Sequence, residues 1–89
     1  MSPDTVWRIA ARFRLQYEPV QSAWVLLYPE GMVKLNGSAG AILSRCDGVR
    51  TLADIVADLE RAYDTSGLAG DVRAFVTMAL EKHWLELRE

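Results

Sequence analysis

The stretch that decides the fold is Glu30-Gly31-Met32-Val33-Lys34-Leu35-Asn36-Gly37-Ser38-Ala39-Gly40-Ala41-Ile42-Leu43. It opens with a turn, and a short apolar strand over Met32–Leu35 follows. Asn36-Gly37-Ser38 then breaks the strand and supplies N-cap residues for a helix from about Ala39. The residues before this stretch predict strands and the residues after it predict helices.

Two further strands are predicted on the N-terminal side. Phe13, Leu15 and Tyr17 alternate with polar residues, which is typical of a half-buried strand. Ala23–Tyr28 is apolar on both faces and is therefore expected to be the central strand. Turn residues join the three strands, so we expect a three-stranded antiparallel meander with Met32–Leu35 or the first strand at each edge.

The first eleven residues carry no clear strand or helix pattern. We expect residues 1–11 to form a flexible arm, in which Thr5–Ala11 is able to make a short turn of helix. Trp7 and Ile9 give this arm apolar side chains to bury, either against the chain's own core or against a partner.

Three helices are predicted on the C-terminal side. The first runs from about Ser38 to Asp47, with Gly48 as its stop. The second begins at Thr51, where Thr51 and Asp54 resemble a capping box. The third runs from about Asp71 to Trp84, and Leu85-Glu86-Leu87 either continues it or finishes extended. Its main apolar face is Val72, Phe75, Val76, Ala79 and Leu80, and Met78 lies on an apolar flank that is able to contact the core or a partner.

Length and charge bound the function. The 89 residues suit one domain with a modest core and little room for a deep cleft. The net charge is −2 without a basic run, which argues against a nucleic-acid partner. No segment has the length and hydropathy of a membrane span or a secretory signal. A single cysteine allows no intrachain disulfide, and we expect a reduced, cytoplasmic protein.

Residues that would carry catalytic chemistry are scarce. His83 is the only histidine and Cys46 the only cysteine, so no metal cluster of known spacing and no nucleophile–base pair is present. Cys46 continues the apolar stripe of the first helix and is expected to be a small core residue. The sequence therefore predicts a binding module without a cofactor or metal, and not an enzyme.

An ordered set of short motifs resembles the pyrroloquinoline quinone biosynthesis protein D (PqqD) family. The motifs are Trp24-Val25-Leu26-Leu27-Tyr28-Pro29-Glu30, Lys34-Leu35-Asn36, Ile42-Leu43-Ser44-Arg45-Cys46-Asp47-Gly48 and Thr51-Leu52-Ala53-Asp54-Ile55-Val56. The similarity runs from about Arg12 to Leu87. It implies an α+β, winged-helix-like domain of three strands followed by three helices, the recognition element of systems that modify ribosomally made peptides.

The resemblance also implies a function and a site. Such a domain binds a precursor peptide of the PqqA type and presents it to a radical S-adenosylmethionine enzyme of the PqqE type. The peptide adds as a strand to the third strand and packs against the third helix, which agrees with an open edge at the end of a meander. Carried onto this sequence, the peptide-binding residues are Met32, Val33, Lys34, Leu35, Arg73, Phe75, Val76 and Ala79.

Two other functions remain open from the residues alone. The second and third helices are able to form a helix-turn-helix, but the first turns of the third helix hold Asp71 and a single Arg73, where a DNA reader needs Arg, Lys, Asn or Gln. An exposed edge strand, Trp7 and the apolar flank of the third helix would also suit a dimerisation module, and a homodimer is compatible with peptide binding.

Overall fold

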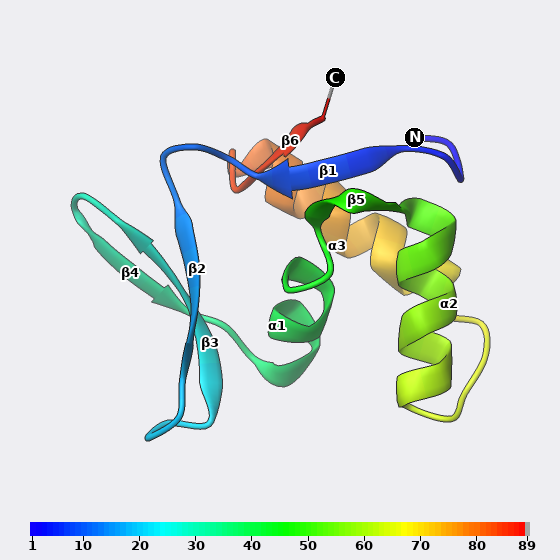
Figure 1. Ribbon diagram of the computed structural model, residues 1–89, viewed down its shortest axis with the longest axis horizontal. Coiled ribbons are helices and arrows are strands. Elements are labelled where there is room, and N and C mark those ends of the chain that lie inside the picture. Colours follow the sequence, from blue (N-terminus) through cyan, green and yellow to red (C-terminus); the bar gives the residue numbers. More distant parts are fainter. Residues whose placement is uncertain (89) are drawn as a thin grey trace.

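The chain forms two three-stranded antiparallel sheets and three helices in a computed structural model that describes residues 1–88. One sheet has the order β2-β3-β4 and the other β5-β1-β6, and the helices lie between and beside them (Figure 1). In chain order the elements are β1 (Val6–Ile9), β2 (Arg14–Glu18), β3 (Ala23–Tyr28), β4 (Gly31–Lys34), α1 (Gly37–Leu43), β5 (Asp47–Thr51), α2 (Leu52–Ala62), α3 (Ala69–Glu81) and β6 (Leu85–Leu87).

The predicted meander is confirmed as the β2-β3-β4 sheet. Leu26 in β3 pairs with Leu15 in β2 and with Val33 in β4, so β3 is the central strand. Val25 and Leu26 are adjacent, so their side chains lie on opposite faces of β3, and both are fully buried. Both faces of this strand are therefore covered, which explains why its side chains are apolar on both faces. The sheet leaves β2 and β4 as its two edges.

The first helix is shorter than predicted. The side chain of Asn36 caps α1 by accepting a hydrogen bond from Ala39 N at 2.8 Å, as the sequence indicated. The helix ends at Leu43 and not at Asp47. Gly48 does have a left-handed φ of +80°, but it lies inside β5 and does not stop the helix. The Asp47 carboxylate instead accepts the N–H groups of Val49 and Arg50 and turns the chain into β5.

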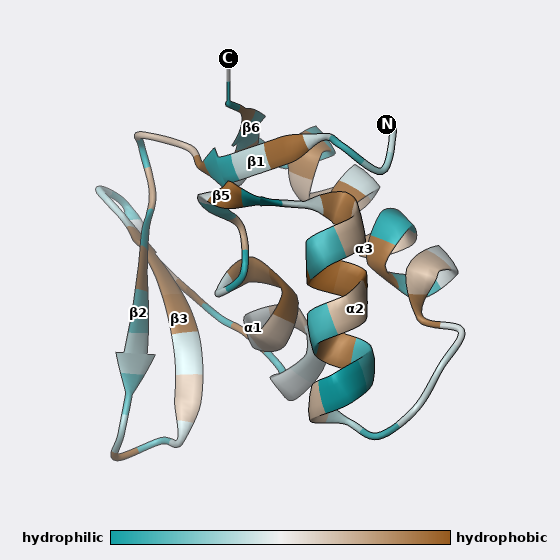
Figure 2. Ribbon diagram, turned by 45° about the vertical axis from the view of Figure 1, so that its right-hand side comes forward, coloured by the Kyte–Doolittle hydropathy of each residue, from teal (hydrophilic) through white to brown (hydrophobic). Residues whose placement is uncertain are grey.

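The second helix begins as its capping box predicted. Asp54 N donates to the Thr51 hydroxyl at 3.1 Å, and Thr51 N donates to the Asp54 carboxylate at 3.0 Å. The two bonds satisfy two of the backbone donors that a helix start leaves open. Leu52, Ile55 and Leu59 form the buried stripe of α2, and Figure 2 shows hydrophilic and hydrophobic bands along this helix.

The β5-β1-β6 sheet was not predicted, and it corrects the expectation of a flexible arm. Val6–Ile9 is the central strand of this sheet, paired with β5 on one side and β6 on the other. Trp7 in β1 is fully buried. Four residues carry too weak an alternation to reveal a strand, so β1 exists because β5 and β6, far along the chain, supply its partners.

The third helix ends in a turn that returns the chain to the sheet. α3 stops at Glu81, and His83 takes a left-handed φ of +61°. Trp84 O then accepts a hydrogen bond from Ala10 N at 2.9 Å, and Leu85–Leu87 pairs with β1. Of the two endings that the sequence allowed, the extended one is correct. Within residues 1–88 no helix is both long enough and apolar enough to cross a bilayer.

Cys46 lies in the core, as its place in the apolar stripe predicted. The side chain is 2% exposed, and its thiol donates to the carbonyl of Ile42 at 3.4 Å. Burial, together with the nearby charge of Asp47, raises the pKa of this thiol to about 12. At neutral pH the group is therefore a protonated thiol and a poor nucleophile.

We expect Cys46 to resist thiol reagents in the folded protein. At pH 8 the reaction with dithionitrobenzoate should be slower by on the order of a thousandfold than that of the protein in denaturant, because the reactive thiolate is scarce and shielded. Absorbance of the released thionitrobenzoate measures both rates. A fast reaction of one equivalent with the folded protein would contradict the buried position.

Candidate functional site: the β4–α3 groove

The edge of β4 presents free backbone groups. Leu35 N donates to Trp24 O at 3.0 Å, so the N–H of Leu35 points toward β3. Because N–H directions alternate along an antiparallel strand, the N–H and C=O groups of Met32 and Lys34 point away from β3. Within residues 1–88 β4 has no strand on that side. The edge therefore offers two residues whose backbone groups an extended chain is able to pair with.

A groove of about 270 Å³ lies beside this edge, between β4 and α3. Val33, Phe75, Met78 and Trp84 are half-buried and give it an apolar wall, while Lys34 stands exposed at its mouth. The complete lining is Val33, Lys34, Leu35, Asn36, Ser38, Ala39, Phe75, Met78 and Trp84. An extended peptide on β4 would therefore place alternate side chains against a ready apolar surface.

A second hollow of about 330 Å³ continues the groove. It shares Val33 and Trp84 with the first, and the rest of its lining is Arg12, Phe13, Tyr28 and Lys82. The rings of Phe13 and Tyr28 are in tilted contact, with centroids 5.6 Å apart. The two hollows adjoin at Val33 and Trp84, which line both, and we refer to them together as the β4–α3 groove.

The charges at the rim of the groove are mainly basic. Lys34 and Lys82 make no ion pair within residues 1–88, and Arg12 pairs with Glu30. The Lys82 ammonium lies 5.8 Å from the centroid of the Trp84 ring, within the range of a cation–π contact. This arrangement favours a peptide that carries acidic residues beside its apolar ones.

The structure places the predicted site residues in four different settings. Val33, Lys34, Leu35 and Phe75 line the groove together. Met32 is 53% exposed and its side chain does not line the groove, so only its outward backbone groups are available to a peptide there. Arg73 is exposed on α3 and does not line the groove, so its predicted contact with the peptide stays a prediction.

Val76 and Ala79 correct the choice of helix face. Both side chains are fully buried, so they are core residues and not the floor of the groove. Phe75 and Met78 each precede one of them by one position, about 100° around the helix, and these two face the groove. The apolar flank that Met78 forms in the sequence was the available signal.

Other lining residues gave little signal. Phe13 directly precedes β2 and Tyr28 ends β3, and the pairing of these two strands brings the two rings together. Trp84 reaches the groove only because the chain turns back at His83. The part of the chain that the structure describes, residues 1–88, contains no cluster of three or more His, Cys, Asp or Glu able to hold a metal ion. The features that the structure shows at the site are the open edge of β4 and the apolar groove beside it.

Residues 23–85 match the family described as coenzyme PQQ synthesis protein D. The chain belongs to the PqqD family. A relative from Stutzerimonas stutzeri (strain A1501), named PqqA binding protein, is 53% identical over 77 residues, which cover 85% of this chain and 84% of the relative. A protein of the same name from Methylococcus capsulatus is 46% identical over 85 residues, 96% of this chain and 91% of that one.

Two solved PqqD structures have the same fold. The PqqD truncation of Methylobacterium extorquens PqqCD, described as a functional and stand-alone RiPP recognition element, has a TM-score of 0.76 at 30% identity and covers 97% of this chain and 94% of that one. PqqD from Xanthomonas campestris has a TM-score of 0.59 at 32% identity, with 98% and 99% covered. The α+β fold implied by the sequence resemblance is therefore confirmed.

Proposed function

We propose that this protein binds a PqqA-type precursor peptide by strand addition to β4 and presents it to a radical S-adenosylmethionine enzyme of the PqqE type. The observation that carries the proposal is the open edge of β4 beside the β4–α3 groove. Backbone groups of Met32 and Lys34 would hold the peptide, and the groove would take its alternate side chains. The name of the curated relatives, PqqA binding protein, supports the choice of peptide.

Recognition without chemistry is the role that this site suits. Strand addition supplies affinity through main-chain hydrogen bonds, and only the pockets for side chains select the sequence. The bound peptide is thereby fixed in an extended form. The enzyme then meets an ordered substrate, because the entropy of ordering the peptide has already been lost on binding.

DNA binding is less well supported by the same surface. The exposed residues of α3 include Asp71 and Glu81 as well as Arg73, so a phosphate backbone on this helix would meet carboxylates. DNA recognition needs clustered bases that neutralise phosphates. The half-buried Phe75 and Met78 face an apolar trough and offer no hydrogen bonds to base edges.

Replacing Lys34 by proline should weaken peptide binding by about tenfold or more. Lys34→Pro removes an edge N–H that β3 does not use, so a buried carbonyl of the peptide would lose its donor at a cost of about 1–3 kcal/mol. Lys34→Ala removes the same side chain but keeps the N–H, and should weaken binding only about two- to fivefold. Isothermal titration calorimetry with the PqqA peptide measures both dissociation constants.

Two controls make this comparison decisive. Proline is tolerated at an outward position of an edge strand, so melting temperatures should show that both variants are folded. Light scattering should show the protein to be monomeric at the concentrations used, because a second copy pairing through β4 would compete with the peptide. If folded Lys34→Pro and Lys34→Ala bind the peptide equally well, strand addition at this edge is wrong.

A further inference from the structure

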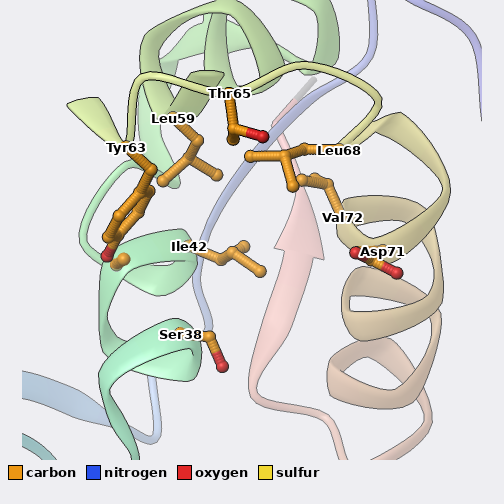
Figure 3. A pocket seen from close by; sticks show the side chains of 9 residues that line it. Ser38, Ile42, Leu59, Tyr63, Thr65, Leu68, Asp71 and Val72 are labelled. Atoms are coloured by element: carbon orange, nitrogen blue, oxygen red, sulfur yellow. The ribbon is translucent and has the colours of Figure 1, made fainter. Parts of the chain in front are cut away.

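A separate apolar cavity of about 250 Å³ lies between α1, the end of α2, the α2–α3 loop and the start of α3. Figure 3 shows Ser38 and Ile42 of α1 on one side of it and Leu68, Val72 and Asp71 on the other. The lining is Ser38, Ala41, Ile42, Leu59, Tyr63, Thr65, Leu68, Asp71 and Val72. We refer to it as the α1–α3 cavity, and the β4–α3 groove does not include it.

The α1–α3 cavity and the groove adjoin each other at α1. Ser38, at the start of this helix, lines both. Along the other wall, Asp71 belongs to the cavity while Phe75 and Met78 belong to the groove, and these positions at i, i+4 and i+7 share one face of α3. One helical turn separates Asp71 from Phe75, about 6 Å along the axis. An extended peptide covers that distance in about two residues.

The volume and lining of the cavity indicate which kind of chemical group would fit it. Binding sites for small molecules usually measure about 300–1,000 Å³, so this volume suits a single large side chain. Ile42, Leu59, Leu68 and Val72 surround it with aliphatic surface, which favours an aliphatic or aromatic group. A strand whose side chains alternate would deliver such a group two positions beyond one seated in the groove.

The charge at the cavity indicates which type of peptide residue would lie beside that side chain. Asp71 is the only charged residue in the lining, is exposed, and makes no ion pair within residues 1–88. Asp58 of α2, by contrast, does not line the cavity and is paired with Arg45 at 2.6 Å and with Arg61 at 3.3 Å. The unpaired carboxylate at the mouth is therefore complementary to a Lys or Arg.

We propose that the peptide bound at β4 continues past the start of α1 and inserts one large apolar side chain into the α1–α3 cavity, with a Lys or Arg beside it that pairs with Asp71. The inference rests on the proposed function, since the occupant is a continuation of the added strand. It assigns the peptide two apolar anchors about two residues apart, the first in the groove and the second in the cavity. It also gives the two anchors different charged surroundings, basic at the groove and acidic at the cavity.

Methyl NMR with the PqqA peptide tests this proposal separately from strand addition. Intermolecular nuclear Overhauser effects are expected between one peptide side chain and methyls of Ile42, Leu59 and Val72, together with amide shifts at Val33 and Lys34. Amide shifts at β4 without contacts in the cavity would overturn this inference and leave strand addition intact. Cavity contacts with silent β4 amides would overturn both, and so would the absence of any change.

Two variants test the anchor and its charged neighbour. Ala41→Leu fills the cavity and should weaken binding by about tenfold or more, since the peptide side chain would remain exposed. Asp71→Asn should weaken it about two- to fivefold. The matched control is Asp64→Asn, an exposed acid of the α2–α3 loop outside the lining, which should leave binding unchanged. Unchanged binding in folded Asp71→Asn, and in Ala41→Leu shown by amide spectra to be native, would overturn the proposal.

Discussion

Trp7→Ala should lower the free energy of unfolding by about 3–5 kcal/mol, the range for deleting a fully buried large aromatic side chain. Trp7 has no exposed surface and belongs to the same core as Leu26, Leu43 and Ile55. Its loss would leave a cavity between the β5-β1-β6 sheet and the helices. Urea denaturation followed by circular dichroism measures the change.

Two other variants serve as controls for Trp7→Ala. Val20→Ala, at a side chain that is 97% exposed, should change stability by no more than about 0.5 kcal/mol. Trp7→Phe should retain most of the stability, because it keeps a large ring and loses only an indole N–H that has no acceptor within residues 1–88. A loss below about 1 kcal/mol for Trp7→Ala would mean that the N-terminal residues are the flexible arm that the sequence suggested.

Gly40→Ala should destabilise the protein by about 1–3 kcal/mol, although alanine normally favours a helix. A Cβ at Gly40 would lie 2.6 Å from Cδ1 of Trp24 and 3.0 Å from its Cβ and Cγ. The Cβ of Trp24 is fixed to the β3 backbone, so the side chain cannot swing clear. Either α1 moves away from β3, or the indole leaves its position.

Gly70→Ala is the matched control, and thermal denaturation of both variants gives the comparison. Gly70 lies in α3, and a Cβ there meets nothing within 4 Å. The alanine should therefore raise stability by up to about 1 kcal/mol, the ordinary helix-propensity gain. If both glycines tolerate alanine equally, the close contact of α1 with β3 is wrong. A shift of α1 would also move Ser38, which lines both the β4–α3 groove and the α1–α3 cavity.

The sequence by itself determined the elements whose signals are local. The alternation of Phe13, Leu15 and Tyr17 identified β2, and the apolar run Ala23–Tyr28 identified the central strand. Asn36 and Thr51 marked the starts of α1 and α2 through hydrogen bonds that span three residues. These signals are reliable because each depends only on dihedral preferences and neighbours within one turn or one strand.

Part of the groove was also available from the sequence. The resemblance placed the peptide between the third strand and the third helix, and Val33, Lys34, Leu35 and Phe75 do line one groove. The exact helix face was not available. Phe75 and Val76 are adjacent apolar residues, and only the packing of α3 against the core decides that Val76 is buried while Phe75 faces the groove.

The tertiary structure alone decided the second sheet and what depends on it. β1 and β6 have four and three residues, and Trp7 pairs with Leu87 across nearly the whole chain. Strands this short have almost no intrinsic preference, so their pairing comes from burial and hydrogen bonds to distant partners. The same pairing draws the chain back after α3 and brings Trp84 into the groove. The local structure of β2, β3 and the starts of α1 and α2 was thus encoded in their own residues, while β1, β6 and the position of Trp84 in the groove came from contacts between the two ends of the chain.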